Sequence, residues 1–155
     1  MLSAKRILTI FRTKGGSGRF TRTAEEMDVE QLSALKPALG GESLLIASIR
    51  SKNEWFALTS SRFIQQCLGR RLTVGLDQID GIATDAQGMA NAKIQDGGML
   101  EVRTRDNSTF TVAVEARGPY FALLNLFLSV ALVNRKPGGN LIRQRATRNE
   151  QRRSV

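Results

Sequence analysis

The side chains of this chain that could do acid–base chemistry are carboxylates, because the sequence contains no histidine and one cysteine, Cys67. A Ser–His or Cys–His catalytic pair, a zinc site of Cys and His, and an internal disulfide framework are therefore excluded. Two carboxylate pairs are available, Asp77 with Asp80 and Asp96 with Asp106. Each lies in a turn context where Asp forms local hydrogen bonds, and Cys67 has the setting of a packed thiol. We therefore expect no catalytic residue, no metal site and no cofactor.

The best candidate site for a small ligand is a basic rim beside the first predicted hairpins. Its members are Lys52, Arg62, Arg70 and Arg71. Glu54 dilutes the charge of this rim. The rim indicates an anionic ligand, and the alternative is that all four are solvated turn residues.

The net charge of +9 is concentrated at the two ends of the chain. Residues 1–22 carry +6 without any acid, residues 23–134 carry −3, and residues 135–155 carry +6. Basic ends are candidates for contact with nucleic acid, an anionic membrane or an acidic partner, and otherwise keep a protein soluble. The residues that would carry polyanion contact are Lys5, Arg6, Arg12, Lys14, Arg143, Arg145, Arg148, Arg152 and Arg153.

Residues 1–11 have apolar residues at helical spacing, which indicates a short cationic amphipathic helix. The run from Ile7 to Phe11 also fits a strand, and the acid-free start resembles a transit peptide. Gly15–Gly18 is then expected to be a flexible joint rather than a phosphate-binding loop, since the Gly-Lys-Ser/Thr ending of a P-loop is missing.

The middle of the chain predicts one helix followed by a series of short strands. A capping-box pattern at Thr23 and Glu26 begins a helix over 24–38, which Gly40 and Gly41 end. The hydrophobic period then changes from that of a helix to that of strands. The predicted strands are 44–51, 54–59, 62–67, 71–76, 79–84, 89–95, 99–105 and 109–115.

A last helix is predicted over 119–134, and it carries no charge between Tyr120 and Val133. This uncharged run is too short to span a bilayer, so we expect the helix to cover the sheet. The core contacts are expected from Tyr120, Leu124, Phe127, Leu128 and Ala131. Large apolar side chains cover more of this helix than one sheet can bury, so one flank, at Leu126 and Val130, is expected to self-associate unless residues 1–11 cover it.

Two short motifs and their order resemble bacterial pleckstrin-homology-like (PH-like or GRAM-like) domains. The stretch 55–64 (WFALTSSRFI) resembles the L-T-N-x-R-L-I hairpin of that group, and 76–82 (LDQIDGI) is similar to its I-P-L-x-x-I-x-x-V strand. A preceding helix that ends in Gly-Glu, here Gly41-Glu42, is common in bacterial members. The resemblance covers about 28–134. It implies a bent antiparallel sheet or barrel plugged by a C-terminal helix, no shared catalytic residues, and ligand contacts from basic residues near the first hairpins.

The sequence thus predicts a mainly β protein: a seven-stranded antiparallel PH-like barrel with a C-terminal capping helix and a preceding N-terminal helix. Residues 1–22 form a basic arm, 23–136 the domain, and 137–155 a basic, disordered tail. The expected function is a non-enzymatic, cytoplasmic binding or scaffold module that self-associates or binds a protein. The alternative is a nucleic-acid-associated protein that binds without base specificity through its basic ends.

Overall fold

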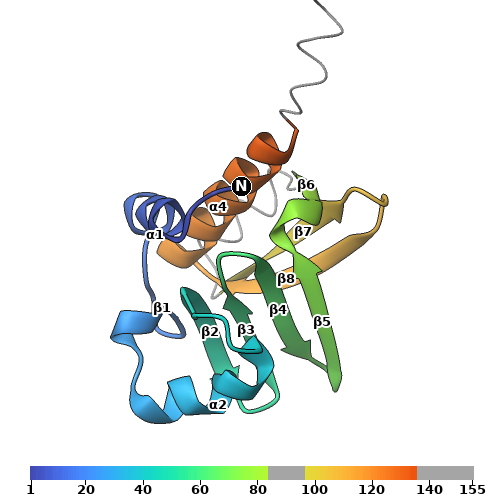
Figure 1. The fold of residues 1–155 in the computed structure, drawn as a ribbon. Helices are drawn as coiled ribbons and strands as arrows, with labels where there is room; N and C mark the ends of the chain where they lie inside the picture. Colours follow the sequence, from blue (N-terminus) through green and yellow to red (C-terminus); the bar gives the residue numbers. More distant parts are fainter. Residues whose placement is uncertain (84–96, 136–155) are drawn as a thin grey trace, which may run out of the picture.

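The computed structural model describes residues 1–83 and 97–135, which form two antiparallel sheets, a helix across them and two further helices (Figure 1). The first sheet has the order β1-β2-β3-β4-β5 and the second β6-β7-β8. The strands of the two sheets are β1 (Thr21–Thr23), β2 (Ile46–Ser51), β3 (Glu54–Leu58), β4 (Arg62–Cys67), β5 (Arg70–Gly75), β6 (Ile79–Ala83), β7 (Gly97–Thr104) and β8 (Thr109–Glu115). The prediction of a seven-stranded barrel is corrected to two separate sheets with eight described strands. The predicted strand 89–95 and the tail 137–155 lie outside the described residues.

The first sheet is a meander, and the side chains along its strands point alternately to two faces, both of which are buried. Phe56, Leu58 and Phe63 point to the face that meets the second sheet, where the Phe63 ring lies 5.6 Å from that of Phe110 in β8. Ala57 and Ile64 point to the other face, which α2 (Val29–Leu39) covers. The predicted antiparallel pairing is confirmed for every described strand from β2 to β8.

The helix predicted over 24–38 is two elements rather than one. Thr23 and Glu26 form the predicted capping box, but it begins a 3₁₀ turn, Ala24–Glu26. A second capping box between Asp28 and Gln31 then begins α2. Two N-terminal caps in succession break the helix because each satisfies the free amides of its own first turn. Gly40 ends α2 in the left-handed conformation at φ 59°.

Helix α4 (Gly118–Asn134) packs across the second sheet and closes the main core. Four of the five predicted core residues are buried: Tyr120, Leu124, Phe127 and Ala131. The fifth prediction was wrong, since Leu128 is 41% exposed.

The first helix is α1 (Ala4–Thr13), and Ser3 caps it by accepting a hydrogen bond from the Arg6 amide. The amphipathic-helix interpretation is confirmed over the strand alternative. Ile7 and Phe11 are fully buried, and α1 packs against α4. Helix α1 of the same chain therefore covers the flank of α4 for which the sequence left open whether residues 1–11 or a second copy would cover it.

This packing corrects the predicted self-association residues. Leu126 is fully buried and Val130 is 4% exposed, both in the same core cluster as Ile7 and Phe11. Side chains that are buried within one chain cannot form the contact between two. The exposed apolar residues of α4 are Leu128, Leu132 and Val133.

Candidate binding pocket between the two sheets

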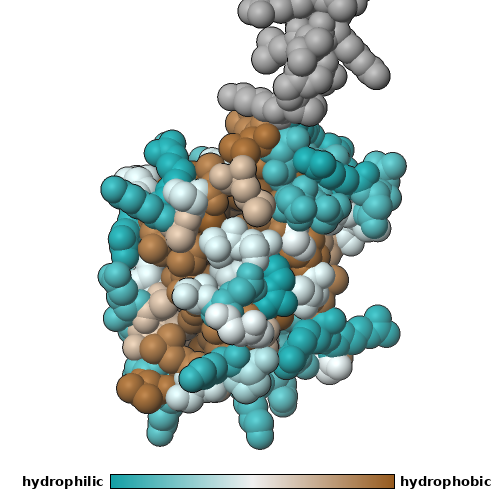
Figure 2. All heavy atoms as spheres, in the orientation of Figure 1, coloured by the Kyte–Doolittle hydropathy of each residue, from teal (hydrophilic) through white to brown (hydrophobic). Residues whose placement is uncertain are grey.

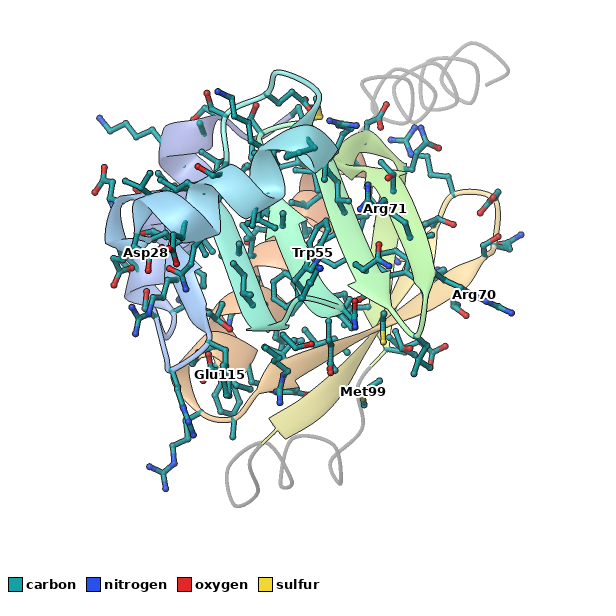
Figure 3. The ribbon with its side chains drawn as sticks, turned by 90° about the horizontal axis from the view of Figure 1, so that it is seen from below. Asp28, Trp55, Arg70, Arg71, Met99 and Glu115 are labelled. Atoms are coloured by element: carbon teal, nitrogen blue, oxygen red, sulfur yellow. The ribbon has the colours of Figure 1, made fainter. Side chains whose placement is uncertain are left out.

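A pocket of about 90 Å³ opens where the two sheets diverge, on the face seen from below in Figure 3. Phe56 of β3 and Gln65 of β4 form one wall, and Met99 of β7 and Thr111 of β8 form the other. Trp55 also lines the pocket, although its side chain packs with the cluster of Ala57 and Ile64 on the α2 side of the sheet. The Gln65 side-chain amide donates a hydrogen bond to the Thr111 carbonyl oxygen at 3.1 Å, which ties the two sheets together beside the pocket. The lining combines apolar side chains, among them Phe56, Met99 and Ala113, with polar ones, as in many ligand pockets.

Three residues from neighbouring strands line up on the α2-facing side of the first sheet, beside the pocket that Trp55 and Gln66 line. Trp55 pairs with Gln66, and Gln66 pairs with Arg71. The Arg71 Nε donates to the Gln66 Oε1 at 3.1 Å, and its guanidinium lies 5.4 Å from the centre of the Trp55 ring. A cation held over an indole and braced by an amide is preorganised to receive an anionic group.

Arg50 lines the pocket from the end of β2 and was missed by the sequence analysis. Its guanidinium lies 5.2 Å from the centre of the Phe20 ring, and that of Arg19 lies 5.0 Å from the same centre. Arg50 is exposed and lies at the register shift between Ile49 and Ser51, so the alternation of β2 gave no signal for it.

The segment that carries Phe20 is held by a buried carboxylate. Glu115, 8% exposed at the end of β8, accepts hydrogen bonds from the backbone amides of Arg19, Phe20 and Thr21 at 2.9, 2.9 and 2.6 Å. A Cβ on Gly18 would stand 2.6 Å from the Glu115 carboxyl group, so only glycine fits there. Residues 15 to 18, predicted as a flexible joint, thus make two close contacts, Gly15 with Gly118 and Gly18 with Glu115.

Of the four residues of the predicted rim, three lie near the pocket. Lys52 lies in the β2–β3 turn, and Arg70 and Arg71 begin β5 beside the β4–β5 turn. All three are exposed. With Arg50, they outnumber the nearby carboxylates, Glu54 in the lining and Glu101 opposite Thr111, so the surroundings of the pocket are positively charged.

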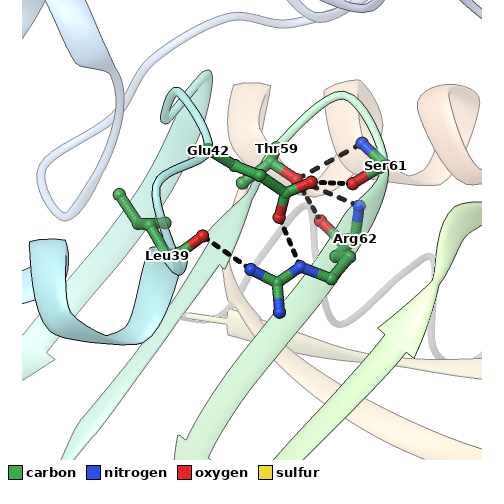
Figure 4. A network of polar contacts seen from close by, with 5 residues as sticks. All are labelled: Leu39, Glu42, Thr59, Ser61 and Arg62. Atoms are coloured by element: carbon green, nitrogen blue, oxygen red, sulfur yellow. Dashed lines mark hydrogen bonds and ion pairs between the residues drawn. The ribbon is translucent and has the colours of Figure 1, made fainter.

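Arg62 does not belong to this rim, because it lies at the other end of β4, opposite Gly75 (Figure 4). It forms an ion pair with Glu42 and donates to the Leu39 carbonyl oxygen at 2.6 Å. The Ser61 hydroxyl also donates to Glu42. The hydrogen bond from Ser61, followed by that from Arg62, holds the pKa of Glu42 below its usual value. Arg62 thus fastens the end of α2 to β4 and is not free for a ligand.

Of the carboxylates considered for acid–base work, Asp80 and Asp106 have structural partners, and Asp77 is exposed in the turn before β6. Asp80 accepts from the Arg103 Nε at 2.8 Å, and Asp106 accepts from the Ser108 amide at 3.0 Å within the β7–β8 turn. Hydrogen bonds, first from Thr104 and then from Ser108, lower the pKa of Asp106. Asp96 lies outside the described residues. Within 1–83 and 97–135, no three Cys, Asp or Glu side chains gather as metal ligands would.

The basic residues of the N-terminal arm lie on the solvent side of α1 and just after it. Lys5, Arg6, Arg12 and Lys14 are exposed, and Arg12 pairs with Glu25 at 3.2 Å. The other candidate polyanion contacts, in 143–153, lie outside the described residues.

No helix among the described residues is long and apolar enough to cross a membrane. Comparisons with protein-family models, with curated proteins and with solved structures find no match to this chain.

Proposed function

We propose that this chain is a non-enzymatic PH-like binding module that holds an acidic segment of a protein partner in the pocket between the sheets. The order of its elements supports the PH-like assignment. Four antiparallel strands, β2 to β5, are followed by three, β6 to β8, and then by α4. That is the order which the motifs at 55–64 and 76–82 imply.

The observation that carries the proposal is a pocket with apolar side chains in its lining and cations in and beside it. A volume of about 90 Å³ accommodates one apolar side chain and not a whole drug-sized ligand. Such a pocket suits an extended peptide that inserts one side chain and places its neighbours at the opening. Arg50, Arg70 and Arg71 favour acidic neighbours, and β8 is an edge strand along which a peptide can lie.

Isothermal titration calorimetry of the full chain with a short Glu/Asp peptide around a central phenylalanine tests this proposal. Arg71→Gln removes the charge above Trp55 and is expected to weaken binding about tenfold, as for a lost charge-assisted hydrogen bond. Arg12→Gln removes one positive charge from α1 instead and is the matched control. Equal losses in the two variants would show general charge attraction rather than a site.

Nucleic-acid association through the basic ends is the second candidate, favoured by the exposed cations of α1. Binding would then come from counterion release and fall about a thousandfold between 50 and 200 mM salt if about six charges contact phosphate. The pocket variants would leave nucleic-acid binding unchanged.

A reducing, cytoplasmic setting completes the main proposal, since the chain has one thiol, which is free.

A further inference from the structure

The second half of α4 presents an apolar stripe to solvent. Leu128, Leu132 and Val133 are 41%, 58% and 37% exposed. Leu128, Leu132 and Arg135 follow one another at steps of four and three residues, so they share one side of the helix. Figure 2 shows the corresponding hydrophobic surface over the end of α4, with hydrophilic surface on both sides of it.

This stripe cannot turn inward, because both ends of α4 are fixed. The Asn134 side-chain amide donates to the Leu76 and Ile79 carbonyl oxygens at 2.8 and 2.6 Å. At the other end, Gly118 packs against Gly15. The opposite side of the helix is occupied by the core, including Leu126 and Phe127.

Arginines surround the end of the stripe. Arg105 donates to the Asn134 carbonyl oxygen at 3.1 Å, and Arg135 follows directly. A Cβ on Gly81 would lie 3.1 Å from Arg135 and 2.9 Å from Arg103, so these two guanidinium groups lie close together. Among the described residues, Asp80 pairs with one of these arginines, Arg103, at 2.8 Å.

Helix α1 adds positive charge on the neighbouring side. Its C-terminal end meets the start of α4, because Gly15 lies against Gly118, and the two helices pack against each other. Lys5 and Arg6, near the start of α1, are exposed. Neither α1 nor α4 contains an Asp or Glu.

We propose that this face of α4 and α1 docks on an anionic lipid membrane, with α4 lying along the surface. Exposed leucines flanked by cations fit the boundary between acyl chains and anionic headgroups. A second copy of this chain fits less well, because a two-fold contact through the stripe would bring the arginines of both copies together. A nucleic acid would leave the leucines unused.

This placement directs the pocket away from the membrane. Trp55 and Met99 lie on the face seen from below, whereas the end of α4 lies at the top in Figure 1. The proposal uses no pocket residue, so it can fail or hold independently of the proposed function.

Flotation of the full chain with vesicles of equal phosphatidylglycerol and phosphatidylcholine tests this, with pure phosphatidylcholine vesicles for comparison. Binding is expected only to the anionic vesicles. Leu128→Ser with Leu132→Ser is expected to weaken it about a hundredfold, at about tenfold for each leucine. Arg105→Gln with Arg135→Gln is expected to weaken it about twenty-fivefold, at about fivefold for each charge.

Matched controls keep the result specific to this face. Leu68→Ser changes an exposed leucine of the β4–β5 turn, and Arg70→Gln with Arg71→Gln removes two charges beside the pocket. Both are expected to leave vesicle binding unchanged, and equal loss in the controls would overturn the proposal. The leucine positions are exposed, so these variants are expected to fold, which circular dichroism checks. Light scattering that shows a dimer lost with the two leucines, or DNA binding without vesicle binding, would also overturn it.

Discussion

Gly15 and Gly118 pack directly against each other, so that a Cβ on Gly15 would stand 1.9 Å from the Gly118 carbonyl oxygen. This contact joins the end of α1 to the start of α4, and residues 1–22 thereby contribute a helix and part of a strand to the packed domain. The glycine-rich segment therefore has a steric role that its composition alone does not reveal.

The Gly118→Ala variant is expected to lower the free energy of unfolding by about 1–3 kcal/mol, as for other overpacked sites. Its Cβ would lie 2.6 Å from the Gly15 carbonyl oxygen, and both groups are backbone-bound and cannot move aside. Urea unfolding measures the change. Lys14→Ala, at an exposed neighbouring position, is expected to change stability by less than about 0.5 kcal/mol. An unchanged midpoint of urea unfolding for Gly118→Ala would contradict the close contact between Gly15 and Gly118.

Truncation of the α4 core residue Phe127 to alanine is expected to cost about 3–5 kcal/mol. Its ring is fully buried and lies 5.6 Å from that of Phe63, edge to face. The adjacent Leu128→Ala is the control, because Leu128 is 41% exposed and its truncation leaves no enclosed cavity. Similar losses in the two variants would mean that α4 presents a different side to the sheets.

The Glu115→Gln variant is expected to destabilise the fold by about 1–3 kcal/mol, because a buried backbone donor loses its acceptor. The Glu115 carboxylate receives three backbone amides, while a carboxamide has one oxygen and adds an N–H that faces them. Thermal unfolding compares this variant with Glu101→Gln, which makes the same change at an exposed position of β7. Hydrogen exchange at residues 19–21 should accelerate only in Glu115→Gln. Equal protection in both variants would contradict the role of Glu115 in holding these amides.

The ion pair of Glu42 and Arg62 predicts a loss of stability in acid. The pKa of Glu42 in the folded protein lies below its ordinary value of 4.5, through the hydrogen bonds from Ser61 and Arg62. Its stabilisation is therefore present above about pH 4.5 and is lost as the pH falls through the lower, folded-state pKa. Urea unfolding between pH 7 and pH 3 should show the difference between the native chain and Glu42→Gln shrinking on acidification. A constant difference across that range would contradict this role.

Local signals predicted much of the fold, while long-range pairing was out of reach. The bounds of β4 and β8 match the predicted 62–67 and 109–115, because turn residues flank both strands. β1 was missed because three residues, Thr-Arg-Thr, carry no periodic pattern and pair with β2 more than twenty residues away. The crossing of α1 over α4 was out of reach for the same reason.

The candidate site was predicted in part. Arg70 and Arg71 begin β5 beside a turn, as expected, whereas Arg62 is taken up by Glu42, a partner that sequence spacing does not identify. Burial on α4 was misassigned at Leu126 and Leu128, since an apolar helix has no polar side to indicate its orientation.

Intrinsic fluorescence tests the central claim most directly, because Trp55 is the single tryptophan of the chain and is among the residues that line the pocket. Titration with the acidic peptide is expected to shift the emission of Trp55 and to saturate at the affinity measured by calorimetry. With Arg71→Gln the shift should require about tenfold more peptide. Peptide binding in the calorimeter with no change in Trp55 emission would contradict the account, because the peptide would then bind away from the pocket.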